Sequence, residues 1–401
     1  MTQHSAPDYH FSAHAGRLPA SPANRILDMA AEPGLISLAA GNPAPEAYPV
    51  EEIRRIAGEI LDREPMAALP YSVPQGDPGL RTAVLNFLAG KFTPANGDGC
   101  LIVTGAQQGA DLTARVLLDP GDTVLCEAPT FLGVMDAFRA TGARLRGIPM
   151  AEDGIDLAAL EAALREEKRV RLLYTIPNFQ NPTGITLPAE KREALCRLAE
   201  RYDFIILEDD PYGDLRFSGE ALPPVKAFDR EGRVLYMGSF SKILAPGVRT
   251  GYLVGAKPVI DRLTTLKSAC DVHSNSLGQL ICKRFLEEVD LGAHLERLRS
   301  IYRARCGQML RALEREFDPR VRWTRPEGGL FLWCTLPEED AMPFVKRAAA
   351  EGVLVVPGAG FLPEPDAVSP SFRLNFSTPT GGEMERGIAI LGRLTKGLAA
   401  R

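Results

Sequence analysis

The stretch RVLYMGSFSKILAPGVRTGY, residues 233–252, joins an apolar segment to a cluster of polar residues. The apolar part is typical of a buried strand, and Ser239, Ser241, Lys242 and Arg249 follow it within a few positions. One interpretation is a solvent-exposed turn at the end of a strand. The other is an anion site with a reactive amine, because hydroxyls and an arginine bind anions and apolar neighbours lower the pKa of a lysine.

Short apolar runs of the same kind recur around this stretch. They occupy residues 101–105, 123–129, 169–177 and 204–210, and segments of helical spacing follow the first three. Alternating strands and helices indicate βαβ units and a largely parallel sheet. Because the runs are apolar throughout, we expect helices on both faces of the sheet.

The pattern changes after about residue 285. A charged segment with helical spacing covers residues 286–317, and three strand-like stretches follow it: GGLFLWCTLP, VLVVPGAGF and SFRLNFS. Together they predict a smaller α+β unit. We therefore expect an N-terminal arm over residues 1–45 that packs with the small domain, a large domain over 46–285 and a small C-terminal domain over 286–401.

Composition narrows the class of protein. The 401 residues are 45% hydrophobic and 24% charged, which is typical of a globular protein, and a net charge of −5 gives no reason to expect nucleic acid or an anionic membrane as a partner. No apolar run reaches the ~20 residues of a membrane span, and the N-terminus has no apolar signal core. The seven cysteines form no CxxC pair, and none of the five histidines pair at ligand spacing. We expect a cytoplasmic protein without a metal site or disulfides.

Polar residues also follow the other apolar runs, and the carboxyl ends of parallel strands form one ligand site. TGAQQGADL, from residue 104, opens a helix whose first N–H groups suit phosphate. EDDPY, residues 208–212, is either an exposed acidic turn or places Asp209 near the core, where its charge needs a cation. PNFQNPTG, residues 177–184, is either a plain loop or a source of binding amides. Arg373 in SFRLNFS either lies at an edge in water or binds a carboxylate.

Taken together, these stretches resemble the class I/II pyridoxal 5′-phosphate (PLP)-dependent aminotransferases. NPTG, DDPY, SFSKILAPGVRTG and FRLNF occur in the family's order and at about its spacing, and the resemblance runs from residue 36 to the C-terminus. GNPAPEAYP, YSVPQGDPGLR, GAQQGADL and GGLFLW are most similar to the 2-aminoadipate (lysine-pathway), kynurenine and aromatic aminotransferase branch. The resemblance implies an aspartate aminotransferase-like α/β fold, with a mostly parallel seven-stranded sheet sandwiched by helices and a smaller α+β domain.

The resemblance also implies PLP as the cofactor and gives roles to the polar residues. Lys242 matches the lysine that forms a Schiff base with the cofactor aldehyde. Tyr71 matches a tyrosine that reaches the phosphate from the neighbouring subunit, which implies a homodimer. The other residues that match phosphate ligands are Gly105, Ala106, Gln107, Ser239, Ser241 and Arg249.

Around the cofactor ring, Asp209 matches the carboxylate that faces the pyridine nitrogen, and Asn181 and Tyr212 match the residues that bond the phenolic oxygen. Phe131 matches the aromatic residue that stacks on the ring. A buried carboxylate favours the protonated ring nitrogen, and hydrogen bonds to the phenolic oxygen stabilise its anion. Lys242, once released, would act as base and then acid at the substrate Cα.

On the substrate side, Arg373 matches the arginine that binds the α-carboxylate, with Gly41 and Asn181 nearby. In this branch an arginine of the N-terminal arm can meet an acidic substrate side chain, but the matching position here is Asn24, with Arg25 next to it. The amino donor is therefore left open among 2-aminoadipate, aromatic and aliphatic amino acids, with 2-oxoglutarate or pyruvate as acceptor. Residues that either line the pocket or serve only in packing or at the surface are Phe11, Leu18, Leu330 and His273.

The predicted activity is transfer of the α-amino group of an L-amino acid to a 2-oxo acid by a ping-pong mechanism. C–S lyases, decarboxylating enzymes and ring-forming synthases share the same core residues, so a PLP-dependent lyase or synthase is the alternative. A transcription regulator is less favoured, because no basic helix-turn-helix segment precedes residue 36 and the net charge is acidic. A binding protein without chemistry would not need Lys242, Asp209 and Arg373 together.

Overall fold

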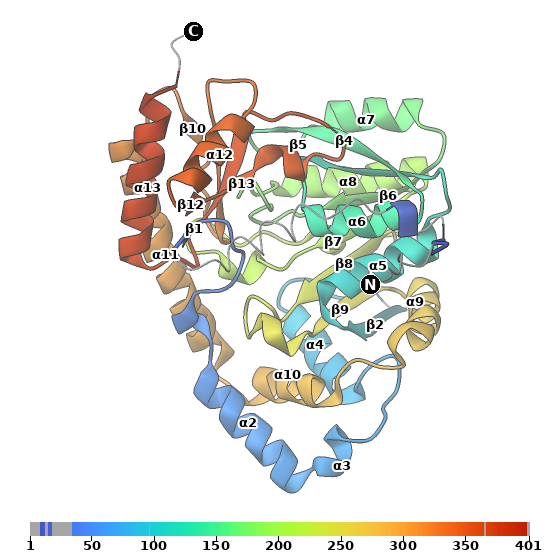
Figure 1. Cartoon of the computed structure of the whole chain (residues 1–401). Coiled ribbons are helices and arrows are strands. Elements are labelled where there is room, and N and C mark those ends of the chain that lie inside the picture. The colour runs from blue at the N-terminus through green and yellow to red at the C-terminus, as the bar shows by residue number, and fades with distance from the viewer. Residues whose placement is uncertain (1–8, 13–14, 18–33, 96, 365, 399–401) are drawn as a thin grey trace, which may run out of the picture.

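One large mixed sheet dominates the fold in the computed structural model, which describes residues 9–12, 15–17, 34–95, 97–364 and 366–398 (Figure 1). The strand order is β2-β9-β8-β7-β6-β3-β4-β5. The strands from β4 to β8 in this order run parallel, whereas β9 is antiparallel to both β2 and β8. The long strands are β2 (Asp98–Val103), β3 (Thr123–Ala128), β4 (Arg144–Ala151), β6 (Val170–Thr175), β7 (Ile205–Asp209), β8 (Val234–Ser239) and β9 (Gly251–Ala256).

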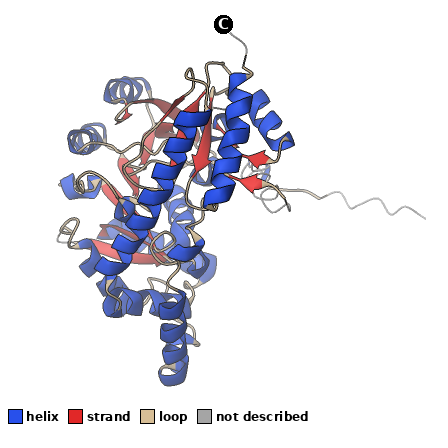
Figure 2. Ribbon diagram, turned by 90° about the vertical axis from the view of Figure 1, so that its left-hand side faces the viewer, coloured by secondary structure: helices blue, strands red, loops and turns tan. Residues whose placement is uncertain are grey.

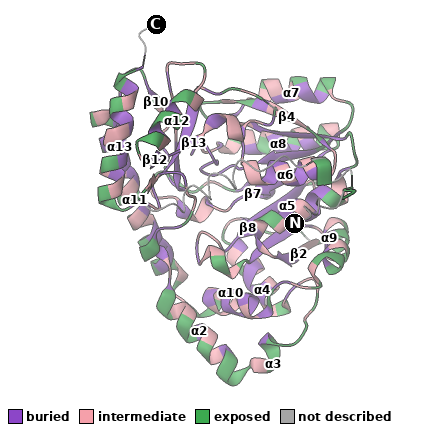
Figure 3. Cartoon of the chain, in the orientation of Figure 1, coloured by how far each residue is buried: buried purple, intermediate pink, exposed green. Residues whose placement is uncertain are grey.

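The predicted mostly parallel seven-stranded sheet is confirmed by these long strands, and the two-residue β5 (Gly154–Ile155) adds an antiparallel edge to β4. The central strands are buried on both faces, as the purple colour in Figure 3 shows. Every residue of β8 is buried, and in β3 only Ala128 is partly exposed. Such complete burial requires cover on both faces of the sheet, which explains why these strands are mostly apolar.

Helices provide this cover, and side chains next to them define several of their ends. Asp77 accepts a hydrogen bond from the N–H of Leu80, and Asp156 accepts from Ala158 and Ala159, so each begins a helix in the way expected of an N-cap aspartate. The helices up to residue 288 are α2 (Val50–Arg63), α3 (Pro65–Ala68), α4 (Pro78–Leu88), α5 (Gly105–Leu117), α6 (Leu132–Ala140), α7 (Leu157–Glu166), α8 (Ala189–Tyr202), α9 (Lys257–Asp271) and α10 (Ser276–Glu288).

The chain then forms a smaller antiparallel sheet in the order β10-β11-β14-β13, which agrees with the expected α+β unit. The charged segment at residues 286–317 is not continuous, because Asp290 accepts a hydrogen bond from Ala293 and starts a new helix. That long helix, α11, packs beside α13 (Figure 2). The elements are α11 (Leu291–Glu316), β10 (Arg322–Trp323), β11 (Phe331–Thr335), α12 (Met342–Ala350), β12 (Val353–Leu354), β13 (Val356–Pro357), β14 (Ser371–Asn375) and α13 (Gly381–Lys396).

The start of the described main body lies against this small unit. Strand β1 (Ile36–Ser37) pairs in parallel with β12. The N–H of Leu38 donates to the carbonyl of Leu354, and the N–H of Asn375 donates to the carbonyl of Leu38. Residues 36–39 are therefore held beside β14, although the domain boundaries at 45 and 285 stay a prediction.

A tight contact joins the loop after β6 to the turn before β11. Phe179 is buried, and its ring fills the space where a side chain at Gly328 would stand: an added Cβ would lie 2.3 Å from the ring. Gly184 adopts a φ of +73°, and a Cβ there would lie 2.7 Å from the carbonyl oxygen of Phe331. Glycine is required at these positions because the two segments approach so closely. The contact fixes Asn181, which lies between Phe179 and Gly184 in the chain, near Phe331.

Three expectations from the sequence concern membrane-spanning helices, disulfides and metal sites. None of the helices described combines the length and apolar character that crossing a membrane requires. All seven cysteines are free thiols, and six of them are buried. Within the described ranges, no group of histidine, cysteine, aspartate or glutamate side chains is placed to hold a metal ion.

Candidate active site

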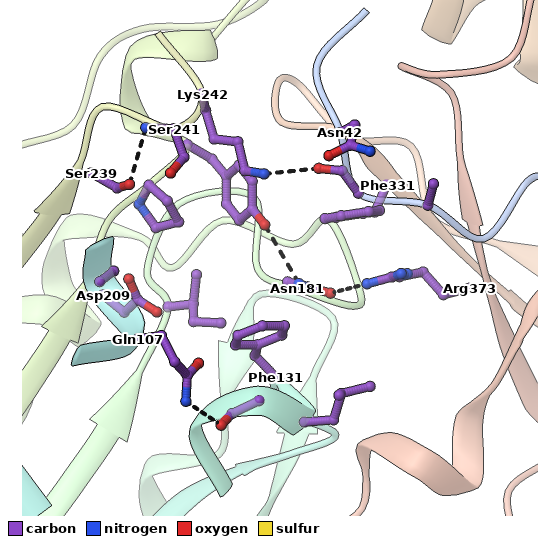
Figure 4. A pocket seen from close by; sticks show the side chains of 18 of the residues that line it. Asn42, Gln107, Phe131, Asn181, Asp209, Ser239, Ser241, Lys242, Phe331 and Arg373 are labelled. Atoms are coloured by element: carbon purple, nitrogen blue, oxygen red, sulfur yellow. Dashed lines mark hydrogen bonds between the residues drawn. The ribbon is translucent and has the colours of Figure 1, made fainter. Parts of the chain in front are cut away.

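A cavity of about 410 Å³ opens at the carboxyl ends of the parallel strands (Figure 4). It is large enough for a small ligand together with a cofactor. One side is lined by residues that follow the strands of the large sheet. The other side is lined by residues 39–42, Phe331, Val356 and Arg373, which belong to the N-terminal segment and the small sheet.

The N-terminus of α5 forms one end of the cavity. Thr104 stands at its N-cap but provides no side-chain cap, because its hydroxyl bonds to Asp271 and Ser274 instead. Ala106 and Gln107 line the cavity with the first turn of the helix. An uncapped helix start attracts anions through its N–H groups and its dipole.

Ser239, Ser241 and Arg249 line the same end of the cavity. The N–H of Ser241 donates to Oγ of Ser239 over 3.1 Å, which keeps both serines at the end of β8. Arg249 takes a left-handed backbone conformation, with φ of +50°, and its guanidinium reaches Gly105: a Cβ added there would lie 2.3 Å from Nη2. Only glycine leaves room for this approach, so the hydroxyls, the guanidinium and the helix start converge as they do in phosphate sites.

Lys242 extends from the turn after β8 into the cavity (Figure 4). Its Nζ donates a hydrogen bond to the carbonyl oxygen of Gly41 over 2.8 Å. Burial, reinforced by the positive charges of Arg373 and Arg249, lowers the pKa of Lys242 to about 8. An amine with such a pKa is partly neutral near neutral pH and can act as a nucleophile or a base.

Asp209, the last residue of β7, is the carboxylate that lines the cavity. Its Oδ2 accepts a hydrogen bond from the hydroxyl of Tyr174 over 2.7 Å, whereas Oδ1 is buried without a hydrogen-bond partner. Burial raises the pKa of Asp209 to about 7; the bond from Tyr174 opposes this rise, and the charge of Asp210 adds to it. A buried carboxylate oxygen without a partner fits a cationic N–H donor of a ligand.

Asn181, Tyr212 and Arg373 form a connected group in the cavity, and Figure 4 shows Asn181 and Arg373 on the opposite side from Asp209. Nη1 of Arg373 donates to Oδ1 of Asn181 over 2.7 Å, and Nδ2 of Asn181 lies 3.5 Å from the hydroxyl of Tyr212. Nη2 of Arg373 donates to the carbonyl oxygen of Ala39 over 2.7 Å. The guanidinium lies 4.1 Å from the ring centroid of Phe331, so this cation is held by amides and aromatic faces and not by a carboxylate among the described residues.

Phe131 and its neighbours give the cavity an apolar surface. Phe131 precedes α6, and its ring faces the space between Asp209 and Arg373 (Figure 4). Nε2 of Gln107 donates to the carbonyl of Gly133 over 2.7 Å and ties α5 to this turn. Further apolar side chains come from Leu132, Ile176 and Val356.

Some predicted residues lie away from the cavity. Tyr71 is 90% exposed and packs on His273 with a centroid distance of 5.9 Å, in a separate surface hollow. Phe11 is 78% exposed and Leu330 is fully buried, and neither lines the cavity. Asn24, Arg25 and Leu18 lie outside the described residues.

Other contributors are not predicted from the sequence. They include Asn42, Phe331 and Val356 in the cavity and Tyr174 behind Asp209. The glycine pair of GGLFLW is the available signal for Phe331, because two glycines before an aromatic residue indicate a close approach of another segment. A tyrosine in an otherwise apolar strand is the corresponding signal for Tyr174, since buried hydroxyls need partners.

The arrangement fits an aromatic ligand with a phosphate at one end and a basic ring nitrogen. The α5 N-terminus with Ser239, Ser241 and Arg249 offers the anion site, and Oδ1 of Asp209 offers the acceptor. Lys242 lies at the same cavity as a reactive amine, and Arg373 adds a second cationic site for a small anion. These features fit PLP and a substrate carboxylate.

Comparisons with known proteins agree with this chemistry. The profile of the family described as aminotransferase class I and II matches residues 33–391. The chain is 39% identical over 393 residues to aromatic-amino-acid aminotransferase 1 of Thermococcus litoralis, covering 96% of this chain and 94% of that protein. It is 38% identical over 394 residues to 2-aminoadipate transaminase of Thermus thermophilus, covering 97% of each. The crystal structure of Pyrococcus horikoshii kynurenine aminotransferase, in complex with PMP, KYN as substrates and KYA as products, matches with a TM-score of 0.94 and 39% identity, over 97% of this chain and 98% of that chain.

Proposed function

The chain belongs to the aminotransferase class I and II family, and from this premise we propose how its residues bind cofactor and substrate. It is a PLP-dependent aminotransferase, which moves an amino group from an amino acid to a 2-oxo acid, and the lyase or synthase alternative is not favoured. When bound, PLP supplies an aldehyde that condenses with amines and a ring that accepts electron density from the substrate Cα.

The cofactor side of the cavity consists of the α5 N-terminus, Ser239, Ser241 and Arg249 for the phosphate, and Asp209 for the ring nitrogen. The support is the uncapped helix start beside a guanidinium and two hydroxyls, and the partnerless Oδ1 of Asp209. Phe131 would stack on the ring, and Asn181 and Tyr212 would bond its phenolic oxygen. Gly105 leaves the space that Arg249 occupies.

Arg373 binds the α-carboxylate of the substrate in this proposal. Arg373 is 7% exposed and its guanidinium is held by Asn181 and Ala39, so it is oriented before the substrate arrives. Nε is buried without a partner. A preorganised buried cation favours a carboxylate and sets the direction of the bonds at Cα.

Lys242 is the proposed base and acid. Its Nζ would take the proton from the substrate Cα and give it up to the cofactor carbon that carried the aldehyde, and the carbonyl of Gly41 keeps Nζ directed into the cavity. The lowered pKa of about 8 supports this role, because a base works best when its pKa is near the working pH. Asp209 remains an anion opposite the ring nitrogen through these steps.

We propose that the preferred donors carry aromatic or aliphatic side chains, with 2-oxoglutarate or pyruvate as acceptor. Leu132, Ile176, Phe331 and Val356 give the cavity its apolar surface. Among the described residues that line it, the cations are Lys242, Arg249 and Arg373, and each already has a role. No described cation is left for an acidic side chain, so 2-aminoadipate is the weaker donor. The acceptor enters the same cavity, so the same reasoning favours pyruvate over 2-oxoglutarate.

We also propose a cytoplasmic homodimer in which Tyr71 completes the phosphate site of the partner subunit. Tyr71 and the nearby Leu69 and Met66 are 90%, 69% and 76% exposed, an unusual amount of apolar surface for one short segment. Burial of this surface against a second copy would stabilise it. The seven free thiols support a reducing compartment.

The observation that carries the proposal is that a partnerless carboxylate oxygen of Asp209 shares a cavity with the amine of Lys242. The test is to add single amino acids to the purified holoenzyme and record its absorption. With phenylalanine or leucine, the band of bound PLP should move to the shorter wavelength of the aminated cofactor and return when pyruvate is added. A response to 2-aminoadipate alone would refute the donor preference, and release of pyruvate or sulfide without amination would refute the proposed reaction.

A further inference from the structure

Two neighbouring carboxylates at the end of β7 are each held by a tyrosine from an adjacent strand. The hydroxyl of Tyr174, on β6, donates to Oδ2 of Asp209 over 2.7 Å. The hydroxyl of Tyr236, on β8, donates to Oδ2 of Asp210 over 2.9 Å. Both tyrosines are fully buried.

The two carboxylates differ in their second oxygen. Oδ1 of Asp210 accepts hydrogen bonds from Nδ2 of Asn178 over 2.9 Å and from the N–H of Gly213 over 3.0 Å. Oδ1 of Asp209 has no partner and belongs to a residue that lines the cavity. Asp210 is therefore a satisfied structural group, whereas Asp209 has one oxygen fixed and the other available.

Tyr174 is placed to act on the cavity only through Asp209. It does not line the cavity, and its ring packs edge-on against Phe138 with a centroid distance of 5.8 Å. Burial and the neighbouring carboxylates raise the pKa of Tyr174 well above its ordinary value, so the hydroxyl stays a neutral donor. The titratable and charged groups around Asp209 are Glu127 from β3, Tyr174 from β6, Asp210 next to it, Tyr212 from the following turn, and Lys242 and Arg249 across the cavity.

We propose that Tyr174 is a positioning residue that holds Asp209 by Oδ2, so that Oδ1 faces the ring nitrogen of the cofactor as an anion; this rests on the proposed cofactor site. The hydrogen bond acts in two ways. It fixes the side-chain rotation of Asp209, and it stabilises the charged form that burial disfavours. Without the hydroxyl, Oδ2 would be buried without a partner and Asp209 would more readily take up a proton.

The test compares Tyr174→Phe with Tyr236→Phe, because each removes one buried hydroxyl from one carboxylate of the same strand end. Apoenzyme is titrated with PLP and with its deaza analogue, in which CH replaces the ring nitrogen. We expect Tyr174→Phe to weaken PLP binding about tenfold and analogue binding by less than about twofold. Only PLP has a ring nitrogen that can bond to the charged Asp209, so only PLP binding depends on how that carboxylate is held. Tyr236→Phe should leave both affinities within about twofold of wild type.

Equal weakening of both ligands by Tyr174→Phe would overturn the proposal, because it would mean a general structural defect, and so would an unchanged preference for PLP. If wild-type apoenzyme binds neither ligand, the cofactor site itself is wrong. Should Tyr174→Phe not fold, Asp209→Asn is compared with Asp209→Asn/Tyr174→Phe. The added change should then leave the PLP preference unaltered, and a further selective loss would show that Tyr174 acts by another route.

Discussion

The cofactor side and the substrate side of the cavity are built in different ways. The cofactor-side residues Asp209, Ser239 and Lys242 stand at or directly after strands of one sheet, so their backbone positions follow from strand pairing. The substrate-side Arg373 is held by contacts between distant segments: it bonds to Ala39 and to Asn181. In the proposed site, the sheet therefore positions the residues that would act on the cofactor, whereas packing of the small unit positions the arginine that would bind the substrate carboxylate.

We therefore expect changes on the cofactor side to affect all substrates alike, whereas a change at Arg373 should discriminate between substrates that carry an α-carboxylate and those that lack it. Two of the contacts cross between the sides: Nζ of Lys242 donates to the carbonyl of Gly41, and Nη1 of Arg373 donates to Oδ1 of Asn181. Lys242 is also the proposed nucleophile and base, so its removal should have the largest effect.

Lys242→Ala should lower turnover by at least ~10⁴-fold for every donor, because both a nucleophile and a general base are lost. The proposed phosphate ligands Ser239, Ser241 and Arg249 do not depend on the amine, so the variant should still bind PLP. Steady-state transamination with phenylalanine and leucine measures the loss, and equilibrium dialysis measures the cofactor. Activity within about tenfold of wild type would contradict the role of Lys242.

Arg373→Gln should reduce kcat/KM for phenylalanine by roughly 10²–10³-fold, since truncating one partner of a buried charged pair costs about 2–5 kcal/mol. The matched substrate is phenylethylamine, which lacks the carboxylate. Its slow turnover should change much less, and PLP affinity should stay the same. If amine and amino acid lose activity equally, Arg373 supports the structure and does not bind the carboxylate.

The sequence predicts the cofactor side of the cavity better than the contacts that hold the substrate side. Lys242 and Asp209 are predictable because polar residues directly after an apolar run stand out locally. The bond from Arg373 to Ala39 joins residues far apart in the chain, and no local pattern indicates it. Tyr174 is missed because the residues of RLLYT do not show which group the tyrosine hydroxyl contacts, and here that group is the carboxylate of Asp209.

The fold shows similar limits. The buried strands β3, β6, β7 and β8 are predicted because they are mostly apolar. Strand β4 is not, because RLRGIPMA carries polar residues that the structure leaves partly exposed. The reversed direction of β9 cannot be predicted from its residues, since an apolar strand buried on both faces has the same composition in either direction.

Lys242→Met should stabilise the apoenzyme at pH 7 by roughly 1–3 kcal/mol, which would separate function from stability on the cofactor side. The folded pKa of about 8 lies below the ordinary value of 10.5, so the buried ammonium destabilises the fold below pH 8. This penalty fades as the pH rises from 8 to 10.5, where the unfolded chain is still protonated and the folded amine is neutral. Urea unfolding of both proteins at pH 7 and pH 10 measures how much Lys242→Met stabilises the apoenzyme. A stabilisation that is larger at pH 10 than at pH 7 would contradict this prediction.

Tyr71→Phe should have the smallest effect, weakening PLP binding by about three- to tenfold through loss of one hydrogen bond to a phosphate. Donor preference should not change, because in the proposed dimer the hydroxyl would contact the cofactor and not the substrate. Tyr9→Phe is the matched control, since Tyr9 is also exposed, at 64%, and has no proposed contact with the cofactor.

Mixing Tyr71→Phe with Lys242→Ala subunits tests whether Tyr71 acts across the proposed dimer. In a mixed dimer the only functional lysine belongs to the Tyr71→Phe subunit and receives an intact Tyr71 from its Lys242→Ala partner, so its PLP affinity should return to the wild-type value. An affinity that stays weakened in the mixed dimer would place Tyr71 within its own subunit's site and refute the exchange between subunits.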